Sequence, residues 1–146
     1  MTGWVYLEMK LPTDIKILER IYKNYKKDFE GYEADNTIRN NKIYVSIDLQ
    51  KVAKELKVDK DIVFGRLYYH LNHKFNYQNA DKSHVKLLIK RSDYGKDEKG
   101  HEINFPYMTS ILAGMQYEHR KYQMATVIAI ISLVVSVASV LISVFV

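Results

Sequence analysis

The chain has 146 residues, 22 lysines and arginines, 17 aspartates and glutamates, and no cysteine. The absence of cysteine excludes disulfide scaffolds, thiolate metal sites and a cysteine nucleophile, and it fits a reducing compartment. All charged residues lie before residue 124, so the formal excess of five positive charges belongs to residues 1–123. A segment of that length holds a single hydrophobic core, and we therefore expect one folded domain rather than two.

The start of the chain predicts a short strand and then an amphipathic helix. Residues 3–11 are rich in strand-forming side chains, and residues 12–29 have an apolar stripe at helical spacing. The stripe consists of Ile15, Leu18, Ile21, Tyr22, Tyr25 and Phe29. The opposite face carries Lys16, Arg20, Lys23, Lys26 and Lys27. Such a basic face is most often solvated, and the alternative is contact with phosphates or lipid headgroups.

The middle of the chain predicts a strand followed by two helices. Residues 42–47 alternate apolar and polar side chains as a strand does, and Asp48 is placed to cap a helix over residues 49–58. After a short polar break, residues 62–76 form a second helix with two distinct faces at 100° per residue. Its core face holds Val63, Phe64, Leu67, Tyr68, Leu71 and Phe75. Its polar face holds Arg66, Tyr69, Asn72, His73 and Asn76.

A β-hairpin is expected after these helices. Residues 84–92 and 101–107 are two strand candidates, and residues 93–100 between them contain two glycines and mixed charges that suit an exposed tip. We expect the second strand to end at Pro106.

This order of helix, strand, two helices and hairpin resembles the winged helix-turn-helix fold over roughly residues 13–108. In that family, the second helix of the turn motif enters the DNA major groove, and the hairpin, or wing, contacts the backbone or the minor groove. The resemblance implies that four side chains lie near bases, namely Arg66, Tyr69, Asn72 and His73. It implies that three others lie near phosphates, namely Lys96, Lys99 and His101. Many winged-helix domains instead bind proteins, so both kinds of partner stay open.

The sequence offers little support for catalysis. It has no glycine-rich phosphate loop and no nucleophile elbow, and its five histidines are scattered. His70 and His73 are three residues apart on a helix, but they have no acidic or third histidine partner nearby in sequence. We therefore expect no catalytic residues, no metal site and no cofactor.

Residues 124–146 contain no charge, and as a helix they are about 34 Å long, enough for a hydrocarbon core of about 30 Å. They predict a membrane span; the alternative is a buried core helix. His119, Arg120 and Lys121 precede the span, and positive residues stay on the cytoplasmic side. The start of the chain has no secretory signal. We expect a single-pass tail anchor in the cell inner membrane, with the N-terminal domain in the cytoplasm.

Small residues recur along this span at steps of four and three. They are Ala125, Ala129, Ser132, Ser136, Ser139 and Ser143. The mean spacing of 3.5 keeps one stripe facing a partner helix, and in lipid small residues let helix backbones approach. We call these six residues the seam, and they predict a homo-oligomer. The alternative is that each serine simply bonds its own backbone. No proline occurs from residue 107 to 146, so one helix is expected to run from the hairpin into the bilayer.

Together these features predict an α+β protein with three parts: a winged-helix-like cytoplasmic domain (1–108), a juxtamembrane helix (109–123) and a transmembrane anchor (124–146). The expected function is a non-enzymatic membrane tether that self-associates and presents the domain to DNA or a protein partner. The alternative is an oligomerising, membrane-permeabilising effector of a toxin or phage-defence system, with the domain as its regulatory module.

Overall fold

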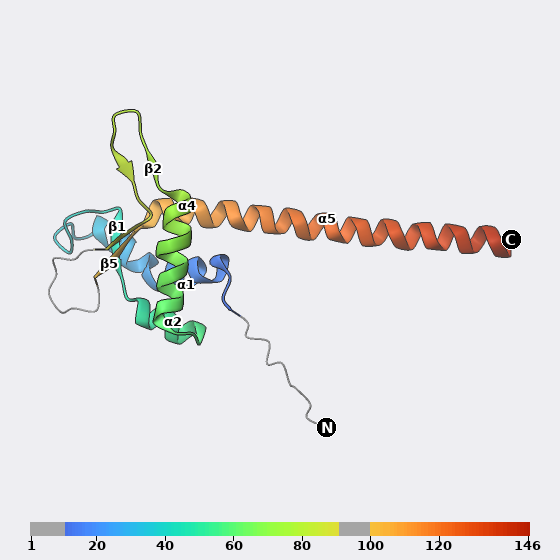
Figure 1. Cartoon of the computed structure of the whole chain (residues 1–146), viewed down its shortest axis with the longest axis horizontal. Helices are drawn as coiled ribbons and strands as arrows, with labels where there is room; N and C mark the ends of the chain where they lie inside the picture. The colour runs from blue at the N-terminus through green and yellow to red at the C-terminus, as the bar shows by residue number, and fades with distance from the viewer. Residues whose placement is uncertain (1–10, 91–99) are drawn as a thin grey trace, which may run out of the picture. The chain divides into compact units, whose positions relative to one another are not determined.

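The computed structural model describes residues 11–90 and 100–146. The chain is an α+β protein with a small antiparallel sheet and a long apolar C-terminal helix (Figure 1). It divides into two units, Met1–Ser110 and Ile111–Val146. The strand expected at residues 3–11, apart from its last residue, and the hairpin tip with Lys96 and Lys99 lie outside the described residues.

Helix α1 (Asp14–Glu30) forms as the apolar spacing predicts. Thr13 caps it, because the hydroxyl oxygen of Thr13 accepts a hydrogen bond from the backbone N–H of Lys16 at 3.3 Å. The buried residues of the helix are Ile17, Leu18, Ile21 and Tyr25. Three of these four belong to the predicted stripe, and Ile17 extends it. A short 3₁₀ turn, η1 (Gly31–Glu33), follows the helix.

The main sheet has the strand order β1-β5-β4, and both pairings are antiparallel. Its strands are β1 (Tyr44–Ile47), β4 (Leu88–Lys90) and β5 (His101–Asn104). Ile103 is the register partner of both Val45 and Leu88, and all three side chains are buried. These pairings confirm the predicted strand over residues 42–47 and the predicted hairpin, and they join the two into one layer.

A second small sheet was not expected from the sequence. Strands β2 (Tyr77–Gln78) and β3 (His84–Val85) pair with each other, so the strand predicted over residues 84–92 is divided between two sheets. Asp81 shapes the intervening turn, because its carboxylate accepts a hydrogen bond from the backbone N–H of Ser83 at 2.9 Å. Lys82 adopts the left-handed conformation there, with φ of 68°.

Helix α2 (Leu49–Leu56) begins at its predicted cap, where the carboxylate of Asp48 accepts from the backbone N–H of Lys51 at 3.1 Å. The next helical stretch runs through three consecutive segments: α3 (Lys60–Gly65), η2 (Arg66–Asn72) and α4 (His73–Phe75). The middle segment, η2, is a π-helix. A π-helix bonds residue i to residue i+5 rather than i+4, so its side chains no longer follow the 100° spacing used to predict the two faces.

The π-helix overturns part of the predicted facing. Leu67 and Asn72, five residues apart, are both buried, with Asn72 only 8% exposed. The expected position of Asn72 on the polar face is therefore wrong. Tyr68, expected in the core, is instead 38% exposed. Val63 and Leu71 are buried as predicted.

Helix α5 (Phe105–Phe145) contains 41 residues, which confirms that one helix follows the hairpin to near the end of the sequence. The second strand ends at Asn104, before Pro106, because Asn104 caps α5 by accepting from the backbone N–H of Tyr107 at 3.1 Å. Pro106 then lies in the first helical turn, where its missing N–H costs no hydrogen bond. By length and composition, the helix is long and apolar enough to cross a membrane.

Candidate functional site

Arg66, the one permanently charged residue of the predicted base-reading set, forms a bidentate ion pair. Its Nε and Nη2 atoms donate to the two carboxylate oxygens of Asp14 at 2.9 and 2.7 Å. Asp14 lies in the first turn of α1, and Nε2 of His70 lies 3.4 Å from the same carboxylate. The guanidinium of Arg66 thus links α1 to η2, and its Nη1 group can still donate to another acceptor.

Asn72 has a structural role in the described fold. Its side-chain oxygen accepts a hydrogen bond from the backbone N–H of Leu88 at 2.9 Å, and Asn76 accepts from the N–H of Leu87 at 3.1 Å. The two amides hold the beginning of β4 against the helix. Both side-chain oxygens are therefore used inside the domain.

The other predicted base-contacting residues, Tyr69 and His73, are exposed, and Tyr69 is 73% exposed. The predicted set is thus separated into two exposed residues, one arginine paired with Asp14, and one buried amide. Lys96 and Lys99, the predicted phosphate contacts, lie outside the described residues.

His101, the third predicted phosphate contact, is partly buried beside Phe64. It is the register partner of Lys90, and its ring meets the edge of the Phe64 ring with centroids 5.4 Å apart. Burial lowers the pKa of His101, and the charges of Lys90 and Lys60 lower this pKa further. Within the part of the chain that the structure describes, neither ring nitrogen has a hydrogen-bond partner. Burial and the neighbouring lysine charges thus disfavour the protonated ring of His101, the form that would attract a phosphate.

Three aromatic rings on one side of the helix contact one another. Phe64 and Tyr68 stack with centroids 5.1 Å apart and planes 12° apart. Tyr69 meets both rings edge-on, at 5.8 Å from Phe64 and 5.2 Å from Tyr68. With His101 against Phe64, these residues form a group that we call the aromatic cluster. The prediction from the sequence missed this cluster because it assigned Phe64 and Tyr68 to the core face of the helix. The two consecutive tyrosines, Tyr68 and Tyr69, were the feature of the sequence that could have indicated the cluster.

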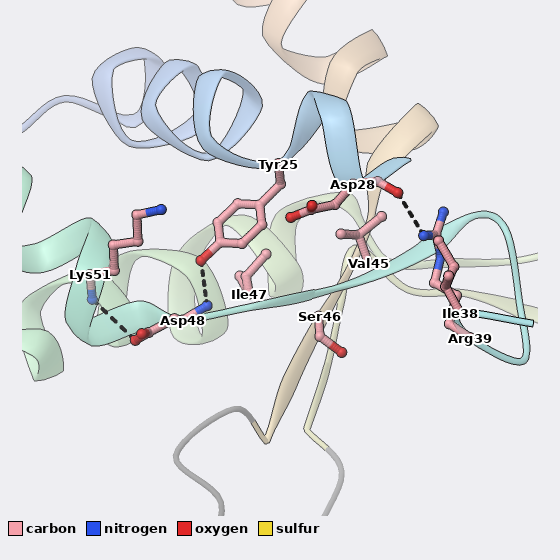
Figure 2. Close-up of a pocket in the computed structure, with 9 residues that line it drawn as sticks. All are labelled: Tyr25, Asp28, Ile38, Arg39, Val45, Ser46, Ile47, Asp48 and Lys51. Carbon is pink, nitrogen blue, oxygen red and sulfur yellow. Dashed lines mark hydrogen bonds between the residues drawn. The ribbon is translucent and has the colours of Figure 1, made fainter. Parts of the chain in front are cut away.

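A pocket of about 540 Å³ lies in the same unit, between α1, β1 and the beginning of α2 (Figure 2). Two hydrogen bonds of the pocket are drawn in Figure 2: the hydroxyl of Tyr25 accepts from the backbone N–H of Asp48, and the guanidinium of Arg39 donates to the backbone oxygen of Asp28. Both have a donor–acceptor distance of 2.7 Å. Burial is the main cause that raises the pKa of Tyr25. Arg39 also donates to the backbone oxygen of Phe29, and so it satisfies two carbonyls at the end of α1.

The polar groups of this pocket thus mainly support the fold. Its lining residues include no histidine or cysteine, and they do not form a pair of nucleophile and base. In the described ranges 11–90 and 100–146, no three histidine, aspartate or glutamate side chains are grouped to hold a metal ion. The aromatic cluster is therefore the stronger candidate for binding.

In the second unit, the serines of the seam bond their own helix. Each hydroxyl donates to a backbone oxygen: Ser132 to Ile128, Ser136 to Ser132, Ser139 to Val135 and Ser143 to Val140, at 2.7 to 2.9 Å. The serine hydroxyl donors are thus satisfied within their own helix, which is the stated alternative to hydrogen bonds between helices. What the seam offers a neighbouring helix is small size and accepting oxygens.

Comparison of the chain with protein families, curated proteins and solved structures found no match.

Proposed function

We propose that this chain is a non-enzymatic, single-pass membrane tether. Helix α5 would anchor it in the cell inner membrane, and the N-terminal unit would be a cytoplasmic winged-helix module for DNA or a protein partner. The observation that carries the proposal is the union of a packed α+β unit with a helix long and apolar enough to cross a bilayer. Arg120 and Lys121, just before the apolar stretch, support the cytoplasmic orientation.

The order of elements supports the winged-helix part of the proposal. Helix α1, strand β1, helix α2, the α3-η2-α4 helix and the β4–β5 hairpin occur in the order of the winged helix-turn-helix fold, with the β2–β3 pair inserted between α4 and β4. Strand β1 pairs with the second hairpin strand, so the three strands form one sheet. The exposed side chains of Tyr69 and His73 on the second helix of the pair remain candidates for partner contact.

The seam supports self-association of the anchor. Small residues on one helical stripe allow close approach of backbones, and the proposed assembly brings several domains together at the membrane surface. The alternative function, a permeabilising bundle, depends on the same serines. The lack of any charge after residue 123 favours packing over an ion path.

Membrane fractionation of the full chain tests the anchor. We expect the protein in the membrane pellet after an alkaline wash, and Val135→Arg near the middle of the span should release it, because arginine there costs roughly 2.5–3.5 kcal/mol. Gln123→Arg is the charge-matched control, since an arginine at the end of the span can reach the headgroups. A wild-type chain in the soluble fraction, or equal behaviour of both variants, would contradict the proposal.

A further inference from the structure

The aromatic cluster presents partly exposed rings at the surface of the domain. Tyr69 is 73% exposed and Tyr68 is 38% exposed, and Phe64 beneath them is partly exposed. The rings support one another through one stacked and two edge-on contacts. Flat, preordered aromatic faces at a surface are suited to stacking with another planar group.

The π-helix adds Tyr69 to this cluster. An ordinary α-helix already places Tyr68, four residues after Phe64, beside the Phe64 ring. Tyr69 is five residues after Phe64, and at 100° per residue the two side chains would point about 140° away from each other. The π-helical bonding of η2 brings residues five apart onto one side, so Tyr69 also reaches Phe64. Such irregular turns occur frequently at functional sites.

Two exposed lysines lie near the cluster. Lys60 precedes Phe64 by one helical turn, and Lys90 is the register partner of His101. Both are exposed, and no residue in the described ranges forms an ion pair with either. Their charges reach the cluster, because both lower the pKa of His101. The acids on either side of Lys60 belong to the start of α3. Asp59 caps the helix by accepting from the backbone N–H of Asp61 at 2.8 Å, and Asp61 lies in the first turn, where the helix dipole favours a negative charge.

We propose that the aromatic cluster, with Lys60 and Lys90, is a stacking platform for unpaired bases of single-stranded nucleic acid. Exposed aromatic rings stack with bases of any sequence, and neighbouring cations contact the phosphates. A duplex hides its base faces, and two side chains expected to read its base edges are engaged elsewhere, Arg66 by Asp14 and Asn72 by Leu88. Lysine at the rim also favours nucleic acid over protein, because lysine is depleted in protein interfaces.

This inference rests on the nucleic-acid branch of the proposed function. The test uses the full chain in neutral detergent micelles and fluorescence anisotropy at low salt, with three labelled probes of about 20 nucleotides: oligo(dT), a mixed-sequence duplex and an abasic strand. Oligo(dT) should bind at least about 10-fold more tightly than the abasic strand, which keeps the phosphates and lacks the bases. It should also bind more tightly than the duplex.

Substitutions then locate the binding. Tyr69→Ala should weaken oligo(dT) binding roughly 5- to 100-fold, the usual range for one lost stacking ring, and Tyr69→Phe should retain it. Tyr117→Ala is the matched control, because Tyr117 is 62% exposed on α5 and lies outside the cluster. Near-ultraviolet circular dichroism verifies that each variant keeps the wild-type fold.

Four results would overturn the platform. They are unchanged binding by Tyr69→Ala, equal affinity for oligo(dT) and the abasic strand, preference for the duplex, and binding to none of the probes. Duplex preference would leave the winged-helix proposal standing and remove only the stacking role. Binding to none of the probes would remove both the platform and the DNA branch, while the membrane tether would still be judged by fractionation.

Discussion

Replacing Asn72 by alanine separates a structural role from a base-reading role. Asn72 is 8% exposed and Leu88 is 1% exposed, so the N–H of Leu88 has little access to water when its acceptor is removed. The lost hydrogen bond, 2.9 Å long, leaves a buried donor unsatisfied, which costs about 1–3 kcal/mol. In a domain of this size, that corresponds to a fall in melting temperature of about 4 to 12 °C.

Thermal unfolding of the full chain in mild detergent, followed by near-ultraviolet circular dichroism, measures this change because the signal reports the tertiary environment of the tyrosines. His73→Ala is the control: His73 belongs to the same predicted base-reading set but is exposed, and its loss should change stability by no more than about 0.5 kcal/mol. Equal melting temperatures for wild type and Asn72→Ala would refute the reasoning. A loss of DNA binding without a loss of stability would restore the base-reading role of Asn72.

Three further predictions concern other parts of the chain. Residues 1–115 should fold without the anchor and unfold cooperatively, because the described core of the first unit is formed within it; aggregation or a flat melting curve would show that the anchor is part of the fold. The free energy of unfolding should fall as the pH drops below about 6.5, because the folded chain resists protonation of His101 and the unfolded chain does not. In chemical denaturation, His101→Phe should reduce this pH dependence. An unchanged pH profile in the variant would contradict the lowered pKa of His101. Replacing Ala129 and Ser136 by isoleucine should lower the oligomer size in detergent, whereas Ile130→Leu with Val137→Leu should not; equal effects would remove the seam.

The elements that the sequence predicted well are those set by local chemistry. The stripe of α1, the alternation of β1 and the cap at Asp48 depend on neighbours within a few residues, and the structure confirms them. The long α5 was likewise evident from composition and the lack of proline. These features needed no knowledge of how distant segments meet.

The missed features depend on contacts between distant segments or on an irregular helix. Arg66 and Asp14 are 52 residues apart, and nothing in a sequence says which exposed charges will pair. The two faces of the second helix were assigned at 100° per residue, and the π-helix changed the positions of Tyr68 and Asn72. Only part of the candidate site was therefore predicted from the sequence. Tyr69 was placed correctly at the surface, whereas Phe64 and Tyr68 beside it were assigned to the core face.

The π-helix also has a consequence for how this protein could change over generations. A turn closed from i to i+5 contains one residue more than an α-helical turn needs. Deleting one residue within η2 would let the helix return to regular bonding, whereas a deletion in β5 would shift a buried strand. A lineage could therefore lose the Phe64–Tyr69 contact by a single codon deletion and still keep a continuous helix. Relatives of this chain with a helix one residue shorter at this point would be expected to keep the scaffold while differing in what its surface binds.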